Sequence, residues 1–544
     1  MKLKSHLITL LFLVPALTVT VLVRLLSESI VGDDAYMTFR VVRNFLDGNG
    51  FVCNPGEYVI STTTPFFALV LAGVSYILGL PPDLAFPYIC YLLDFFNVIF
   101  LFVLTYRVSG NSLVSGVSAL FFSLSSSNIH ASLLGMETPL FIFLLLLSTL
   151  LFIVTSNDSS NSRTNCLGFF FAVLLSITRP EGSFFAALYF IFRWIFTKRF
   201  PLDLFSVLFV VIVPWVVTLY LYFDTVIPQS LEAKSLGYVR LPGEALSAVI
   251  HNFTRLFFYP SGLLDFNYGL LLFFFLLELV LWGAIVAIRK ERNLLIVPFF
   301  LVGFIIVYAV TNPFVFSWYL VPLEPFYCFL FIMGASNLIK NIYRFNRLIA
   351  VSFSGIISLL LFMAFLRYDA LAIRVVNEWP ADIQDSCADE NEPDKVLFAK
   401  YRNIFIVPFL GTRDREMLYK EAAMFLEPVV TPETTVLGPE FGAFGYFSQA
   451  KVISSIGHVN PEIMKYFPLS TDEVDPGINT AIPVRMVKEV LPDYILSLDI
   501  FYRRTLQNDP WFQSNYTLIF SRKSRVFNSE NLNLYVRYDL LVQN

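Results

Sequence analysis

Two adjacent carboxylates, Asp33 and Asp34, are the residues of this sequence best placed to do chemistry. They follow a long apolar stretch near the N-terminus, and Tyr36 and Arg40 come soon after them. A charged side chain near hydrocarbon is costly, so such acids are functional candidates. The pair could supply a general base, or could hold a metal ion or sugar hydroxyls. Helix capping is an equally weighted alternative, because a carboxylate at a helix start satisfies free backbone N–H groups.

Three more charged candidates lie beside apolar runs. Glu137 precedes such a run, where it could act as a site acid or stabilise the positive end of a helix dipole. Arg179 and Glu181 lie in a tight reversal that contains proline and glycine. A local ion pair is the simpler interpretation of these two residues. A phosphate site is the other, because guanidinium matches phosphate geometry.

A second set of candidates combines a lysine with an amide and two aromatic residues. Gln229 and Lys234 follow an apolar run; Lys234 could anchor the chain at a membrane surface or place a point charge on a phosphate. Trp318 and Tyr319 open another apolar run. Such aromatics usually form a belt at the membrane interface, but they could also pack against a saccharide or a lipid.

The amino-acid composition indicates that these residues belong to a membrane protein. Of the 544 residues, 56% are hydrophobic and only 15% are charged. Soluble domains average about 25% charged residues, so the chain is predicted to be a polytopic membrane protein. The net charge of −4 comes without a basic block, which excludes nucleic acid as an expected partner. The five cysteines show no metal-type spacing; they are free thiols or include a Cys53–Cys387 disulfide.

Apolar runs of the length needed to cross hydrocarbon predict about eleven transmembrane helices. The expected spans are 7–26, 86–107, 112–128, 138–155, 166–178, 183–197, 203–222, 267–288, 294–311, 318–337 and 348–366. Asp94 and Glu278 fall inside these spans. We expect both to face the interior of the bundle, because exposure to lipid would be costly.

The distribution of basic residues sets the expected orientation. With Lys2 and Lys4 in the cytoplasm, most later basic turns also fall inside, as the positive-inside rule requires. That arrangement holds only if the apolar segment 65–80 lies along the membrane surface instead of crossing it. The first extracytoplasmic loop is then 27–85, with surface helices.

The composition changes near residue 368. Residues 1–367 form the expected membrane module, and residues 368–544 are rich in Asp, Glu, Pro and Asn. Short β-like runs at 435–437, 494–496 and 516–520 alternate with helical stretches at 414–426 and 484–490. These patterns predict a C-terminal α/β domain on the extracytoplasmic face.

Taken in order, the motifs resemble the integral-membrane glycosyltransferases of the GT-C class, particularly arabinofuranosyl-, mannosyl- and aminoarabinosyltransferases. The segments that carry the resemblance are DDAYMTFRVVRNFLDGNGFVCNPGE at 33–57, GMETPLF at 135–141, TRPEG at 178–182, IPQS and AK within 227–234, WYLVPLEP at 318–325, and GPEFGAFGYFSQAKVISSIGHVNPE at 438–462. Many relatives have His-Arg-Tyr where this chain has Ser317-Trp318-Tyr319. If that Arg contacts the donor phosphate in those relatives, another cation must do so here, or the donor differs.

The resemblance implies a GT-C fold and an inverting hexosyl- or pentosyltransferase of a cell membrane. It would move a sugar from a polyprenyl-phosphate donor to a hydroxyl of a glycan, lipid or protein acceptor on the extracytoplasmic face. Asp33, with Asp34 beside it, is the expected base. No cofactor is required, although a divalent cation could bind at this pair.

The same resemblance makes Arg40, Arg179 and Lys234 candidates for the donor phosphate. With them, the expected donor and substrate contacts are Arg40, Glu137, Arg179, Glu181, Gln229, Lys234, Trp318 and Tyr319. The alternative function is a transporter or flippase of a lipid-linked glycan. The sequence shows no internal repeat of the kind that many transporters have.

Overall fold

The computed structural model describes residues 2–27, 29–155, 162–238, 243–257, 266–366, 407–476, 478–524, 526 and 529–542. Contacts divide the chain into two compact units. The membrane unit comprises 1–28, 87–215 and 243–378, and the sheet unit comprises 29–86, 216–242 and 379–544. The predicted domain boundary at 367/368 and Cys387 lie outside the described residues.

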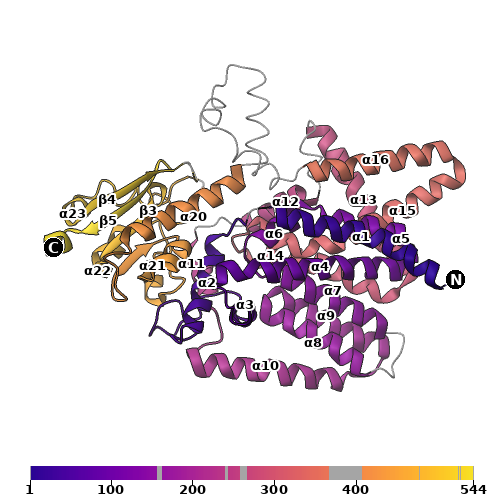
Figure 1. Ribbon diagram of the computed structural model, residues 1–544, viewed down its shortest axis with the longest axis horizontal. Coiled ribbons are helices and arrows are strands. Elements are labelled where there is room, and N and C mark those ends of the chain that lie inside the picture. The colour runs from indigo at the N-terminus through magenta and orange to yellow at the C-terminus, as the bar shows by residue number, and fades with distance from the viewer. Residues whose placement is uncertain are drawn as a thin grey trace, which may run out of the picture. The chain divides into compact units, whose positions relative to one another are not determined.

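All eleven segments that the sequence predicts as membrane spans contain helices (Figure 1). These helices are α1 (Lys2–Leu26), α4 (Pro82–Ser109), α5 (Ser112–Ser123), α7 (Thr138–Thr155), α8 (Ser162–Thr178), α9 (Glu181–Thr197), α10 (Leu202–Phe223), α13 (Phe266–Lys290), α14 (Ile296–Thr311), α15 (Glu324–Phe345) and α16 (Arg347–Leu366). Shorter helices α6 (Ser126–Leu133) and α12 (Glu244–Phe257) and the 3₁₀ turns η2 (Arg292–Leu295) and η3 (Ser317–Leu323) lie between them.

Length separates clear membrane spans from shorter helices. Within the described residues, seven helices are long and apolar enough to cross a membrane, and an eighth span results if α5 and α6, bent by 52°, count as one. Helices α8 and α9 have 17 residues each, or about 25 Å at 1.5 Å per residue, somewhat less than a 30 Å hydrocarbon core. The protein is therefore a polytopic helical membrane protein, while the number eleven stays a prediction.

The two acids expected inside the bundle differ in the structure. Asp94 is completely buried in α4, and its Oδ2 lies 3.0 Å from Nη2 of Arg24, which is itself 1% exposed. This pairing confirms the expected interior position, since each charge offsets the other's lost hydration. Glu278, by contrast, is exposed on α13, so its expected interior position is wrong.

The sheet unit is built on a mixed five-stranded sheet (Figure 1). Its strands are β1 (Thr435–Gly438), β2 (Lys451–Ser454), β3 (Tyr494–Leu498), β4 (Tyr516–Lys523) and β5 (Asn531–Arg537), in the order β2-β1-β3-β5-β4. Pairs β1–β2 and β1–β3 are parallel, whereas β3–β5 and β4–β5 are antiparallel. Parallel pairs need crossover segments, and helices α21 (Gly442–Ser448) and α22 (Val484–Val490) lie in these connections. The predicted C-terminal α/β fold is confirmed.

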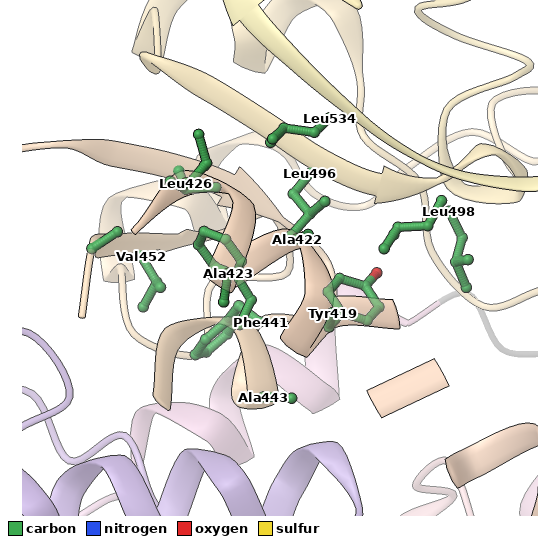
Figure 2. Close-up of a cluster of buried hydrophobic side chains, with 14 of the residues drawn as sticks. Tyr419, Ala422, Ala423, Leu426, Phe441, Ala443, Val452, Leu496, Leu498 and Leu534 are labelled. Carbon is green, nitrogen blue, oxygen red and sulfur yellow. The ribbon is translucent and has the colours of Figure 1, made fainter. Parts of the chain in front are cut away.

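Apolar residues on one side of the sheet pack against helix α20 (Val407–Leu426) and α21. Figure 2 shows Leu496, Leu498 and Leu534 from the strands near Tyr419 and Ala422 of α20. The same buried cluster includes Met37 and Val41 of helix α2 (Asp33–Leu46). The N-terminal acidic motif is therefore anchored to the C-terminal sheet by hydrophobic packing.

Three further elements complete the surroundings of α2. Helix α3 (Pro65–Leu78), with 14 residues, packs against α2, and its predicted position at the membrane surface stays a prediction. Helix α11 (Gln229–Gly237) contacts the 3₁₀ turn η4 (Pro461–Tyr466) that follows β2. Turn η5 (Asp499–Phe501) and helices α23 (Pro510–Asn515) and α24 (Tyr538–Val542) finish the unit.

Candidate active site

Asp33 and Asp34 occupy the first turn of α2, but their carboxylates have different partners. Gly32 is the N-cap residue of this helix. Asp33 Oδ1 accepts a hydrogen bond of 2.6 Å from the backbone N–H of Gly442, at the start of α21. Asp34 Oδ2 accepts one of 3.2 Å from Lys234 Nζ. The two acids thus connect segments that are distant in sequence, besides lying at the positive end of their own helix.

Lys234 reaches Asp34 from α11, and Gln229 fixes the start of that helix. The backbone N–H of Gln229 donates to Ile60 O at 2.9 Å, and its side-chain Nε2 donates to Gly457 O at 3.2 Å. The predicted residue Gln229 is thus a structural contact between α11 and the loop after β2. The Asp34 and Lys234 side chains stay 31% and 15% exposed, so this ion pair remains accessible.

A second charged cluster lies next to Asp33. Arg415 of α20 places Nη1 at 2.7 Å from Glu440 Oε1 and Nη2 at 2.6 Å from Glu416 Oε1. Asp33 and Asp34 both interact electrostatically with this cluster. Four carboxylates therefore share two cations, Arg415 and Lys234, and the site carries an excess of negative charge.

This crowding changes the acidity of the carboxyl groups. Burial, followed by the negative charge of Glu416, raises the pKa of Asp33 well above its ordinary value, although Arg415 opposes the shift. Burial also raises the pKa of Glu416 from 4.5 to about 7, again against the effect of Arg415. Burial acts in the same direction on Asp34, but Lys234, through its charge and its hydrogen bond, together with His458 and Arg415 outweighs it and lowers the pKa of that carboxyl. Asp33 thus favours its protonated form, whereas Asp34 favours its charged form.

Arg415, Glu416 and His458 were not among the predicted site residues. Arg415 and Glu416 lie in a helix whose sequence carries no recognisable motif. Glu440 and His458 fall inside the segment 438–462 that carries part of the resemblance, and this was the one signal that could have marked them. No spacing rule places α20 against α2, because that contact depends on the fold.

Arg40, a predicted phosphate contact, has its donors occupied within the sheet unit. Its guanidinium donates to the carbonyl oxygens of Cys53, Gly445 and Ala450 at 2.6–2.7 Å and to Asn54 Oδ1 at 3.2 Å. The residue is 4% exposed. These bonds connect α2, the loop after it and α21. Because its donors are occupied in this way, Arg40 is a weaker candidate for a phosphate contact than the sequence indicates.

The other predicted residues gather in the membrane unit. Arg179 lies 2.9 Å from Glu181 and 3.4 Å from Glu137, and the three side chains are at most 10% exposed. Glu181 also accepts a hydrogen bond from the hydroxyl of Tyr308. The carbon of the guanidinium is 5.4 Å from the centre of the Tyr319 ring. The local ion pair expected between Arg179 and Glu181 is present.

Trp318 and Tyr319 belong to an aromatic group in η3 of the same unit. The Trp318 ring stacks on Phe316 with 4.5 Å between ring centres, and Tyr319 lies near Tyr308 at 5.9 Å. Both residues are partly buried. This packing positions the aromatic rings against protein, and their proposed contact with saccharide or lipid stays a prediction.

Metal binding was an open expectation for the acidic pair. Within the described residues, no group of three His, Cys, Asp or Glu side chains has the geometry to hold a metal ion. Asp33 and Asp34 are bonded to a backbone N–H and an ammonium, groups that compete with a cation for the same oxygens. Binding of a divalent cation at this pair stays a prediction.

Comparison with known families and structures places the chain by its fold. The family DUF8728, described as a domain of unknown function, matches residues 405–537. No curated protein matches the chain by sequence. The structure of ArnT from Cupriavidus metallidurans bound to undecaprenyl phosphate superimposes with a TM-score of 0.57 at 12% identity, over 97% of each chain. The protein has the GT-C fold.

Two archaeal structures extend the likeness of this GT-C protein. The oligosaccharyltransferase of Archaeoglobus fulgidus in the apo form gives a TM-score of 0.54 at 12% identity, over 98% of this chain and 76% of that one. Its complex with an inhibitory peptide and a dolichol-phosphate gives 0.51 at 12% identity, over 96% and 74%. At such identities the likeness establishes the fold, while residue roles must come from the chain itself.

Proposed function

We propose that this GT-C protein is an inverting glycosyltransferase that moves a pentose or hexose from a polyprenyl phosphate to an acceptor hydroxyl. The observation that carries the proposal is the arrangement of Asp33, Asp34 and Lys234 at the start of α2. A carboxylate of raised pKa stands beside a second carboxylate that holds an accessible ammonium. Such a site can take a proton and can also stabilise a leaving phosphate.

Lys234 is the proposed phosphate contact. An ammonium carries three donors, so Lys234 can keep its bond to Asp34 while it donates to a phosphate oxygen. The lysine is a compact charge on a flexible stem, which suits a headgroup that must arrive and leave. Asp34 then has the role of holding the ammonium in place.

Asp33 is the proposed general base. The acceptor hydroxyl attacks the anomeric carbon, a new C–O bond forms there, and the bond to the phosphate oxygen breaks. The hydroxyl proton passes to the Asp33 carboxylate, and the electron pair of the broken bond leaves with the polyprenyl phosphate. One displacement inverts the anomeric centre. General-base assistance of this kind is worth about 10²–10⁴-fold in rate.

A lipid donor is supported by the membrane spans and by the neighbours. The ArnT structure holds undecaprenyl phosphate, and the archaeal oligosaccharyltransferase structure holds a dolichol-phosphate. Seven or eight candidate spans give this chain a membrane surface along which such a lipid can approach. We place the site on the extracytoplasmic face of a cell membrane, because the basic turns favour that orientation. The acceptor is a glycan, a lipid or a protein, and no cofactor is needed.

The decisive experiment uses purified full-length protein with short-chain polyprenyl phosphates that carry arabinofuranose or mannose, and with a panel of glycan, lipid and peptide acceptors. We expect a glycosylated product of inverted configuration, and we expect Asp33→Asn to lower kcat by about 10²–10⁴-fold. Asp47→Asn is the matched control, because Asp47 is 55% exposed at the end of the same helix.

Two results would overturn the proposal. One is the absence of product from every donor together with full cellular function of the Asp33→Asn variant. The other is protein-dependent movement of a lipid-linked glycan across a vesicle membrane without transfer, which would make the protein a flippase.

A further inference from the structure

His458 lies in a loop that the sheet unit holds firmly against α11. The loop follows β2, and Gly457 adopts a left-handed backbone with φ of 89°. That conformation strains any residue with a Cβ, so the position favours glycine. Gln229 Nε2 donates to the carbonyl of Gly457, and Ile456 packs against Gly237 at the other end of α11. The backbone that carries His458 is therefore fixed from two sides.

The imidazole of His458 is buried without hydrogen bonds. The residue is 4% exposed, and neither Nδ1 nor Nε2 has a partner. Leaving a buried polar group unsatisfied is destabilising. A second unsatisfied group, Ser230 Oγ, is on α11 in a residue only 2% exposed. Ser230 precedes Lys234 by four residues, so both side chains lie on the same helix face.

The surroundings of His458 determine its protonation state. Lys234 and Asp34 are the charged groups that act on it. Burial, and then the positive charge of Lys234, lower the pKa of His458 to about 3, so the ring is neutral at physiological pH. A neutral imidazole offers one donor and one acceptor. That combination suits a hydroxyl group, which also donates and accepts, better than it suits an anion.

We propose that His458 and Ser230 form a subsite that binds a hydroxyl of the donor sugar. The inference rests on the proposed function and deepens it. If Lys234 holds the donor phosphate, the sugar bonded to that phosphate must lie near the ammonium. Lys234 acts electrostatically on His458, and Ser230 is on the same face of α11 as Lys234. The donor's sugar, and not its phosphate or its lipid, is thus the group that the imidazole selects. His458 determines specificity and takes no proton in the reaction.

The test pairs a variant with a modified donor. His458→Phe keeps the volume of the ring and removes both nitrogens. We expect it to raise the donor KM about tenfold, which is about 1.4 kcal/mol and within the range of one hydrogen bond, with little change in kcat or acceptor KM. The donors of the test each lack one sugar hydroxyl. One of them should have a KM about tenfold higher with the wild type, and its KM with the variant should rise no further. Such non-additivity identifies the hydroxyl that His458 contacts.

Three controls separate specificity from folding. His458→Asn retains one donor and one acceptor and should recover part of the donor affinity. His251→Phe, at an exposed histidine of α12, should leave all constants unchanged. The pH dependence of kcat should be the same in His458→Phe and the wild type, because a neutral, non-reacting imidazole contributes no titration. A shifted pH profile would overturn the assigned role.

A binding measurement distinguishes this inference from the proposed function. We expect the sugar-bearing lipid to raise the Tm of the detergent-purified protein more than the bare polyprenyl phosphate does, and His458→Phe to remove that increment. If the sugar-bearing lipid gives this extra rise in Tm and His458→Phe removes it, but no turnover occurs, the subsite is supported and the transferase proposal fails. If turnover occurs but every deoxy donor behaves additively, or no sugar of the panel adds an increment, the subsite is refuted and the transferase stands.

Discussion

The membrane unit and the sheet unit each contain a group of charged residues that the sequence singled out, but the two groups balance their charges differently. In the membrane unit, Arg179 is enclosed by Glu137 and Glu181, and all three side chains are at most 10% exposed. In the sheet unit, Asp34 and Lys234 are 31% and 15% exposed, and three more carboxylates lie near them.

Enclosure and accessibility give the two groups different chemistry. The charge of a buried cation that lies between two carboxylates is already balanced, and removing the cation leaves those carboxylates without a partner in a poorly solvated place. A partly exposed lysine with one carboxylate partner can accept a second anion. Burial, and then the negative charge of Glu416, raise the pKa of Asp33, which makes this carboxylate a better proton acceptor. We therefore assign stability to the Arg179 group and catalysis to the Asp33 group.

The largest expected effect is on stability, from Arg179→Met. The substitution keeps the length of the side chain but leaves Glu137 and Glu181 without their cation. Breaking a buried pair typically costs about 3–5 kcal/mol, so we expect a clear fall in Tm of the purified protein. The kcat of the remaining folded protein should change little.

Arg43→Met is the matched control for this arginine. Arg43 and Asp47 are 35% and 55% exposed, and such a surface pair contributes only about 0–1 kcal/mol. If Arg179→Met instead retained the Tm of the wild type and lost donor affinity, Arg179 would be a phosphate ligand and the contrast between the groups would collapse.

The same kind of substitution in the sheet unit should produce the opposite result. Lys234→Met removes the proposed contact to the leaving phosphate, and we expect kcat to fall about 10²–10³-fold, the usual loss when one stabilising donor of a developing anion is removed. The Tm should change less than in Arg179→Met, because Asp34 remains in contact with solvent. Lys451→Met tests the specificity of the effect, since Lys451 pairs with Glu57 at 38% exposure in the same unit. Equal losses of kcat in the two variants would contradict the assignment.

The sequence predicted the elements well because their signals are local. Apolar run length located the membrane helices, and short β-like runs located β1, β3 and β4. The Asp33-Asp34 and Arg179-Glu181 groups were visible because their residues are adjacent or nearly so. The Lys234–Asp34 contact was not predicted, since 200 residues separate the two; the family resemblance marked both residues as site candidates but did not pair them.

Other features depend on packing that no local pattern encodes. Glu416 and Arg415 reach Asp33 because α20 packs on the sheet beside α21, a contact between segments far apart in sequence. Arg40 looked like a phosphate ligand in the motif, but the folded chain places carbonyl oxygens around its guanidinium. Glu278 was expected in the bundle interior because exposure to lipid would be costly, but hydrophobic runs do not reveal which face of a helix is covered. Composition reveals that a charge lies in a helix, and only the fold reveals its partner.

A smaller effect is expected when the position of Asp33 is changed without changing its chemistry. A Cβ at residue 442 would lie 2.2 Å from the backbone oxygen of Asp33 and 2.7 Å from its Oδ1. Gly442→Ala must therefore displace the start of α2 or of α21, and we expect kcat to fall about tenfold, within the range that misplacement of a reacting group produces. Gly73→Ala, where an added Cβ meets nothing within 4 Å, should leave kcat unchanged. Unchanged kcat in Gly442→Ala would show that the bond from Gly442 to Asp33 has no catalytic importance.

The smallest effect concerns how activity depends on pH. Asp33 must be ionised to take a proton, so kcat/KM should rise with pH through the Asp33 pKa, which burial and then Glu416 raise. Glu416→Gln removes that negative charge, lowers the Asp33 pKa, and should move the rising limb to lower pH while the plateau rate stays the same. Glu427→Gln, at an exposed residue just beyond α20, should leave the limb in place. A limb that moves to higher pH would mean that Glu416 assists ionisation of the base.

The free energy of unfolding provides an independent test of the Glu416→Gln substitution. Because the pKa of Glu416 is raised from 4.5 to about 7, the folded protein binds this proton more tightly than the unfolded chain does. The free energy of unfolding should therefore fall as the pH rises from about 4.5 through about 7, and Glu416→Gln should lack this part of the decline. At pH 8 the variant should melt above the wild type, with the difference shrinking toward pH 5. The membrane unit provides the contrast, because Arg179→Met should lower the Tm at both pH values while Glu416→Gln raises it only where the carboxyl would be charged.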